Sequence, residues 1–254
     1  MKHVYARIRA RLDEYKRAPF YEFLRDPAIR PGDKLVFAPC IGHFVMTFTD
    51  LNKLIYRDLS FDDEYQQIVN RHSYEDEDHW MWLLDDLRKL GWDDKITGIT
   101  ESMRFLWSDC MIETRMLMYR VVARALGAHP LIKLSIIEVF EDCGNVFLSR
   151  INPVARELCR EREFELDFFG RLHLDNELGH VANEGELSRR LQEIELTEEL
   201  RRSALEAVED TFDGLIAFMD ELWSYSQMAL GTRDNAESIA ADPGRAGTEP
   251  RAAW

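Results

Sequence analysis

Along most of the chain, apolar residues recur at steps of three and four, the spacing that places them on one face of an α-helix. Helix-breaking residues are scarce, with 13 Gly and 8 Pro among 254 residues. We find no segment that alternates apolar and polar side chains as a half-buried strand does. The pattern therefore predicts an all-α protein, a single bundle of about seven helices.

Proline, glycine and capping residues mark the ends of the expected helices. The expected ranges are 3–25, 33–58 with a bend at Pro39, 62–90, 100–127, 131–152, 154–182 with a candidate break at 168–170, and 197–230. Residues 231–254 are rich in Ala, Gly and Pro, which predicts a disordered tail. The expected organisation is thus one helical domain, residues 1–230, followed by that tail.

Charge and cysteine usage narrow the cellular context. A net charge of −15 opposes binding to nucleic-acid phosphates or to anionic membranes, so we expect neither partner. No uncharged run reaches the roughly 18 residues that a membrane-spanning helix needs. The first residues lack the apolar region of a signal peptide, and the four dispersed cysteines suit a reducing compartment. A cytoplasmic location is expected.

Two octets, HSYEDEDH at 72–79 and HLDNELGH at 173–180, share one polar pattern: His, three residues, an acid, two residues, His. On a helix, the fifth and eighth residues of such an octet lie within about 40° of the first. Each octet would therefore present two imidazoles and a carboxylate on one face. The candidate ligands are His72, Asp76 and His79 with Glu75 beside them, and His173, Glu177 and His180. Nitrogen and oxygen ligands without thiolate suit iron, manganese or zinc.

A simpler interpretation is that acidic, solvated helix faces carry these histidines by chance, and the run EDED at 75–78 fits it. Against it, Leu83 continues the face of the first octet, which indicates that this face packs inward. Buried histidines and acids need partners. A metal would satisfy all of them, so we favour the metal site.

Other residues are candidates for the rest of the site. In the 131–152 helix, Glu138 stands between apolar pairs and is the acid expected to point into the core, with Glu141 as the alternative, and Asp50 is a weaker candidate. The 100–127 helix offers a substrate pocket wall. Its candidate substrate-binding residues are Trp107 and Met111, with Arg104 and Arg115 to hold a carboxylate, although such arginines often extend to solvent.

This layout resembles the haem-oxygenase-like diiron oxidases, which are related in fold to haem oxygenase, thiaminase II and pyrroloquinoline quinone synthase. The resemblance covers about residues 15–230. Its most specific motif, His-x3-Asp/Glu-x2-His, is met by His173, Glu177 and His180. His79 with Glu75 or Asp76 is similar to the family's earlier ligand pair, and Glu138 or Glu141 to its middle glutamate.

The resemblance implies a non-haem iron-dependent oxidoreductase that uses O2, with two iron ions per chain expected and manganese as an alternative. The implied substrate is a small amino-acid-like or fatty-acid-like molecule that undergoes N-oxygenation, desaturation or oxidative carbon–carbon cleavage. An external electron donor and a homodimer are compatible with it. His72 stands where a glutamate would be expected, so a single-metal site stays open.

Two metal-free alternatives on the same fold also stay open. One is a thiaminase II-like hydrolase, for which Cys143, next to Glu141 and Asp142, is the best candidate nucleophile. The other is a helical partner-binding protein whose Trp residues form an interface. A core position is the commoner role for such residues.

Overall fold

The computed structural model describes residues 1–176 and 189–241, with side chains described up to residue 232. Within these ranges every regular element is helical. The all-α prediction is therefore confirmed for the part of the chain that the structure describes.

The first half of the chain forms short helices, several of them joined by tight turns. They are α1 (Lys2–Tyr15), α2 (Pro19–Arg25), α3 (Pro31–Lys34), a 3-10 turn (Ala38–Ile41), α4 (Gly42–Asp50), a π-helical turn (Leu51–Tyr56), α5 (Glu64–Glu75) and α6 (His79–Lys89). The second half contains α7 (Ile99–Leu106), a 3-10 turn (Asp109–Met111), α8 (Ile112–Ala125), α9 (Pro130–Arg162) and α11 (Glu198–Ala241). Residues 171–176 are also helical.

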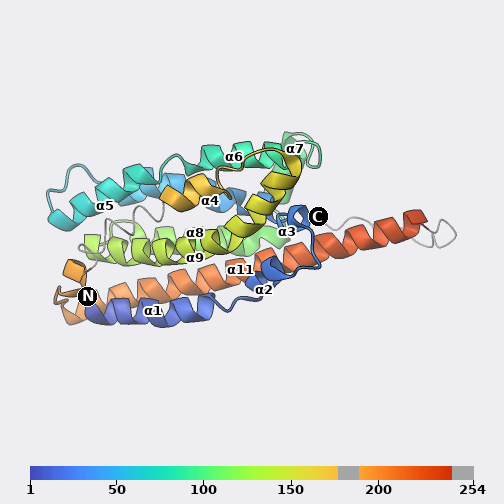
Figure 1. The fold of residues 1–254 in the computed structure, drawn as a ribbon. Coiled ribbons are helices and arrows are strands. Elements are labelled where there is room, and N and C mark those ends of the chain that lie inside the picture. The colour runs from blue at the N-terminus through green and yellow to red at the C-terminus, as the bar shows by residue number, and fades with distance from the viewer. Residues whose placement is uncertain (177–188, 242–254) are drawn as a thin grey trace.

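The long helices α9 and α11 run side by side through the bundle (Figure 1), and α8 and α1 pack against α11. Helices α5 and α6 lie on the side of the bundle opposite α1 (Figure 1). α5 contacts α9, and α6 contacts α4. The acidic first octet is therefore held against the middle of the bundle. By length and composition, no helix in the described ranges could span a membrane.

Local sequence signals explain several helix ends. The Asp63 carboxylate accepts hydrogen bonds from the first backbone amides of α5, and Pro130 opens α9 with His129 as its N-cap. Gly91 and Gly127 follow α6 and α8 with φ of +74° and +67°, a backbone region that favours glycine. These starts and stops were predictable from the residue types alone.

The expected continuous helix 62–90 is wrong in one respect that matters for the site: it is interrupted at residues 76–78, between α5 and α6. Three features favour the break. Acidic residues crowd this turn, and Asp is a poor residue for a helix interior. Arg57, far from the break in sequence, donates to the Ser73 carbonyl oxygen at 2.9 Å and to the Glu77 carboxylate at 2.6 Å. These long-range bonds hold the turn.

The expected helix 100–127 is likewise divided, because α7 ends at Leu106 and α8 begins at Ile112. The Arg115 guanidinium donates to the carbonyl oxygens of Leu106 and Ser108, at 2.6 and 3.0 Å, in the interruption. Two other expected ends are also wrong. α9 continues through Pro153 to Arg162, and α11 continues past Leu230 to Ala241. Buried Ile151, Val154 and Leu158 flank Pro153, and this tertiary packing outweighs the missing backbone hydrogen bond.

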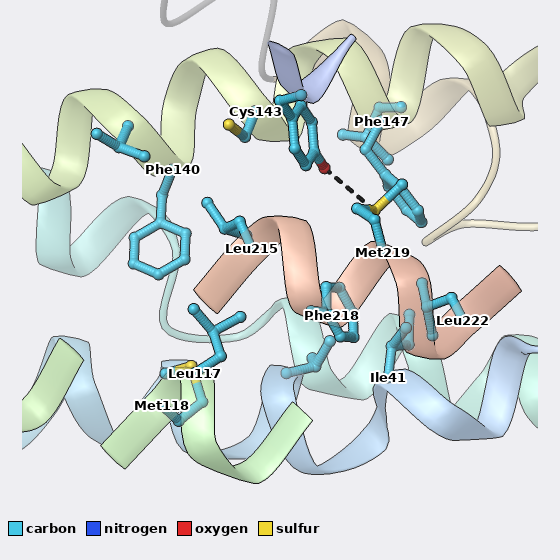
Figure 2. Close-up of a cluster of buried hydrophobic side chains, with 14 of the residues drawn as sticks. Ile41, Leu117, Met118, Phe140, Cys143, Phe147, Leu215, Phe218, Met219 and Leu222 are labelled. Atoms are coloured by element: carbon cyan, nitrogen blue, oxygen red, sulfur yellow. Dashed lines mark hydrogen bonds between the residues drawn. The ribbon is translucent and has the colours of Figure 1, made fainter. Parts of the chain in front are cut away.

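The hydrophobic core is centred between α9 and α11. Figure 2 shows Phe140, Cys143 and Phe147 of α9 facing Leu215 and Phe218 of α11. The Tyr15 hydroxyl donates to the Met219 sulfur at 3.4 Å, the dashed line in that view, and ties α1 to α11. The core therefore brings aromatic side chains from several helices together next to α9.

Candidate metal centre

Three candidate ligands converge where the end of α5 meets α9. His72 Nε2 lies 3.1 Å from Asp76 Oδ2 and 3.5 Å from Glu141 Oε1. Ligand atoms of the three residues all lie within 4.8 Å of one another. The His72 and Asp76 side chains are 5% and 3% exposed, and that of Glu141 12%. An imidazole and two carboxylates thus share a nearly dry position inside the bundle.

The end of α5 is fixed by interactions on its other side. Besides its bonds to Ser73 and Glu77, the Arg57 guanidinium stacks on the Tyr74 ring at 3.5 Å. Tyr56, fully buried, has its pKa raised by burial and by the nearby Asp76 charge, so its phenol stays neutral. Asp76, next to Glu77 in the turn, therefore lies in a segment whose position is fixed by the contacts of Arg57.

Two further histidines meet on the other side of the same region. The rings of His79, the first residue of α6, and His173 have centroids 4.5 Å apart. Trp82 stacks on His79 with centroids 4.6 Å apart. His173 Nδ1 lies 3.0 Å from the Phe168 carbonyl oxygen. Because a carbonyl oxygen only accepts, Nδ1 donates, and Nε2 is the ring nitrogen that could bind a metal.

Asp86 of α6 anchors the segment that leads to His173. Its buried carboxylate accepts hydrogen bonds from the backbone amides of Asp167, at 2.7 Å, and Phe169, at 3.0 Å. Burial raises the pKa of Asp86 to about 6, although both amide bonds act to lower it. One helix therefore carries His79 at its start and, two turns later, the group that positions the backbone around His173.

An apolar cavity of about 110 Å³ joins the two groups. Asp76 and Glu141 of the first group and His79 and His173 of the second all line it. Seven of the thirteen other lining residues are aromatic: Tyr15, Phe44, Phe48, Phe140, Phe147, Phe168 and Phe218. Polar candidate ligands on an otherwise apolar wall are typical of a small-molecule site.

The donor set fits a transition metal of intermediate hardness. Two ligand atoms that share one ion, each about 2.1 Å from it, lie about 3.0–3.4 Å apart at angles near 90–110°. The separations of 3.1 and 3.5 Å around His72 Nε2 are close to this range. Imidazole nitrogen with carboxylate oxygen suits iron, manganese or zinc. His72, Asp76 and Glu141 would hold one ion, and His79 and His173 would contribute to a second.

The structure brings together five of the predicted metal ligands: His72, Asp76, His79, Glu141 and His173. Glu138 is not part of the His72, Asp76 and Glu141 group and does not line the cavity; it accepts a hydrogen bond from the Tyr5 hydroxyl at 3.2 Å. Glu75 and Asp50 are exposed. Glu177 and His180, the remainder of the second octet, lie outside the described residues. Between the two acids of the 131–152 helix, the geometry favours Glu141.

None of the four predicted substrate-binding residues lines the cavity. Trp107 is 57% exposed and Met111 is buried in the core. Arg104 is exposed and pairs with Glu101, and Arg115 is used to bind backbone carbonyls. The prediction relied on one unbroken helix over 100–127, and the interruption there removes the common face on which it rested.

Sequence reasoning missed the residues that support the site. Arg57 and Asp86 act through bonds to residues 16 and 81 positions away, and nothing local in the sequence indicates those partners. The aromatic wall left a weak signal, since Phe44 and Phe48 are one helical turn apart. That spacing predicts a buried face but does not show what the face encloses.

Of the comparisons with known proteins, the one with solved structures bears on the fold. No protein-family model matches the chain, and no curated protein matches it. Among solved structures, the chain is similar to a domain of unknown function with a heme oxygenase-like fold from Shewanella denitrificans OS217. The TM-score is 0.61 at 14% sequence identity, over 90% of this chain and 94% of that one. The chain therefore has a haem-oxygenase-like fold. At this level of identity the likeness establishes the fold alone.

Proposed function

We propose that this protein is a non-haem, iron-dependent oxidoreductase that uses O2 to oxidise a small molecule. One observation carries the proposal: two groups of imidazole and carboxylate side chains, one from α5 and α9 and one from α6 and residue 173, line a single buried apolar cavity. Two iron ions per chain are the expected content, with manganese as the alternative.

In this proposal, His72, Asp76 and Glu141 hold one ion. His79 and His173 contribute to a second, together with Glu177 and His180 of the same octet. Bound iron supplies the electrons with which O2 is reduced. The protein's own residues keep the ligands in place: Phe168 fixes the tautomer of His173 through its carbonyl oxygen.

The cavity wall excludes water and orients the substrate. Six phenylalanines surround the candidate ligands, and a dry wall of this kind limits side reactions of oxidised species with solvent. The reaction types open to such a site are N-oxygenation, desaturation and oxidative carbon–carbon cleavage. An external electron donor would return the metal to its reduced state.

A hydrolase that uses Cys143 is the weaker candidate. Cys143 does line the cavity, but burial, together with the charge of Asp142, raises the pKa of its thiol well above the usual value. A nucleophilic cysteine needs a lowered pKa. The environment of Cys143 acts in the opposite direction.

Metal analysis with matched variants tests the proposal. The purified chain is loaded anaerobically with Fe(II), desalted and assayed for iron per chain. Expected results are about two iron ions in the wild type and a lower content in His72→Ala, His79→Ala and Glu141→Gln. His43→Ala and Asp142→Asn are the controls, because neither side chain is part of the ligand groups. Equal iron in all five variants would overturn the site.

A further inference from the structure

The described cavity wall carries carboxylates but no Lys or Arg, which is unfavourable for binding an anionic metabolite. The described wall contains no Lys or Arg, and its ionisable carboxylates, Asp76 and Glu141, belong to the candidate metal ligands. The sequence of segment 177–188, which the structure does not describe, contains no Lys or Arg either. A substrate carboxylate placed inside the cavity would thus find no Lys or Arg in the described wall to pair with and would lose its hydration.

Gly144 of α9 opens part of this space. It lies in the middle of a 33-residue helix and lines the cavity beside Cys143 and Phe147. A Cβ added at Gly144 would meet no described heavy atom within 4 Å outside its own helical surroundings. Glycine is unfavourable inside a helix. The missing side chain of Gly144 leaves room in the cavity next to Glu141, which lies about one helical turn earlier on α9.

We propose that the cavity binds an uncharged hydrocarbon part of the substrate and that Gly144 determines how large this part can be. The inference deepens the proposed oxidoreductase function and rests on it for the chemistry, but not for the binding. A fatty-acid-like substrate would place its chain among the phenylalanines and its carboxylate outside the cavity or against metal. A zwitterionic amino acid has too little hydrocarbon to gain from this wall.

Binding of simple probes tests the inference without requiring turnover. Titration calorimetry is run with butanol, hexanol and octanol, and with norleucine, which combines a butyl side chain with a zwitterionic end. Wild-type protein should bind the alkanols with affinity rising by about fourfold per added CH2 group until the cavity is full. Norleucine should show no binding at the same concentrations.

Variants at Gly144 make the test specific. Gly144→Leu should weaken hexanol binding by about tenfold or more, because the added side chain occupies the space of the ligand. Gly144→Ala, a smaller change, should shift the preference towards shorter alkanols. Gly231→Leu is the matched control: Gly231 is also a helical glycine with open space around its Cβ direction, but it is exposed on α11. Thermal unfolding checks that each variant is folded.

Two results would overturn the inference: hexanol binding that Gly144→Leu leaves unchanged, or norleucine binding as tight as that of hexanol. Iron content is measured in the same samples. Absence of iron from all of them would contradict the proposed oxidoreductase while leaving the alkanol results to decide the cavity. Normal iron with failed alkanol binding would contradict only the inference about the substrate.

Discussion

The imidazole rings of His79 and His173 have centroids 4.5 Å apart, although a long stretch of chain separates the two residues. Each is the end member of a similar octet, the last histidine of the first and the first histidine of the second. The break at 76–78 separates His79 from the helix that carries His72. Because of it, one octet supplies both groups of candidate ligands: His72 and Asp76 to one, His79 to the other.

Asp86 should make the stability of the protein depend on pH in a recognisable way. Its folded pKa of about 6 exceeds the ordinary value of 3.8, so the folded state binds this proton more tightly than the unfolded state does. Its contribution to stability is complete below about pH 4 and is lost as the pH rises through 6. The loss amounts to at most about 3 kcal/mol.

The variant Asp86→Asn isolates this effect. Asparagine has one carbonyl oxygen for two backbone amides, so at pH 4.5 we expect a loss of about 1–3 kcal/mol in the free energy of unfolding. That difference should shrink towards pH 7.5, where the wild type holds a buried charge and the variant does not. Urea unfolding of both proteins at the two pH values is the measurement. A difference that stays constant with pH would show that Asp86 is not the titrating group.

Arg57 should matter for metal binding more than for folding. Removing its guanidinium in Arg57→Ala releases the turn at 76–78, so Asp76 loses its fixed position. Supporting residues of this kind typically change metal affinity by about 10–100-fold. The measurement is competition between the protein and a chelator for Fe(II). Arg88→Ala, which removes an exposed pair with Asp85 on α6, should bind iron like the wild type, and wild-type affinity in Arg57→Ala would contradict this positioning role.

Gly144→Ala should stabilise the protein by about 1 kcal/mol, since alanine is favoured over glycine inside a helix and the structure offers space for the methyl group. Gly231→Ala should produce a similar gain. Chemical denaturation of the three proteins checks both values. A clear destabilisation by Gly144→Ala alone would mean that the open space next to Gly144 is smaller than described.

Cysteine reactivity gives an independent test of the cavity chemistry. Cys110 is exposed, whereas Cys40 and Cys143 are buried and have raised thiol pKa values, chiefly through desolvation. Iodoacetamide at pH 8 should therefore modify Cys110 rapidly in the native protein and leave Cys40 and Cys143 unmodified until unfolding. Mass spectrometry of peptides over time provides the readout. Fast modification of Cys143 would support the alternative in which Cys143 is the nucleophile of a hydrolase.

The sequence was sufficient for the fold class, and five of its nine candidate ligands lie together in the structure. Periodicity and turn residues such as Gly91 and Gly127 report local backbone preferences, and the octets report ligand chemistry. The predictions that were wrong concern helix interruptions that depend on distant partners. Arg57 stabilises the break at 76–78, which the helical periodicity of 62–90 does not predict, and Arg115 stabilises the interruption after Leu106. The sequence alone could not choose between Glu141 and Glu138, because both lie on one helix; in the structure Glu141 lies beside His72, and Glu138 accepts a hydrogen bond from Tyr5.

Iron bound per chain after anaerobic loading is the measurement that decides whether these side chains bind iron inside the bundle. We expect about two ions in the wild type, a reduced content in His72→Ala and in His79→Ala, and wild-type content in His43→Ala. Wild-type protein that retains no iron after desalting, or variants that retain as much as the wild type, would contradict this expectation.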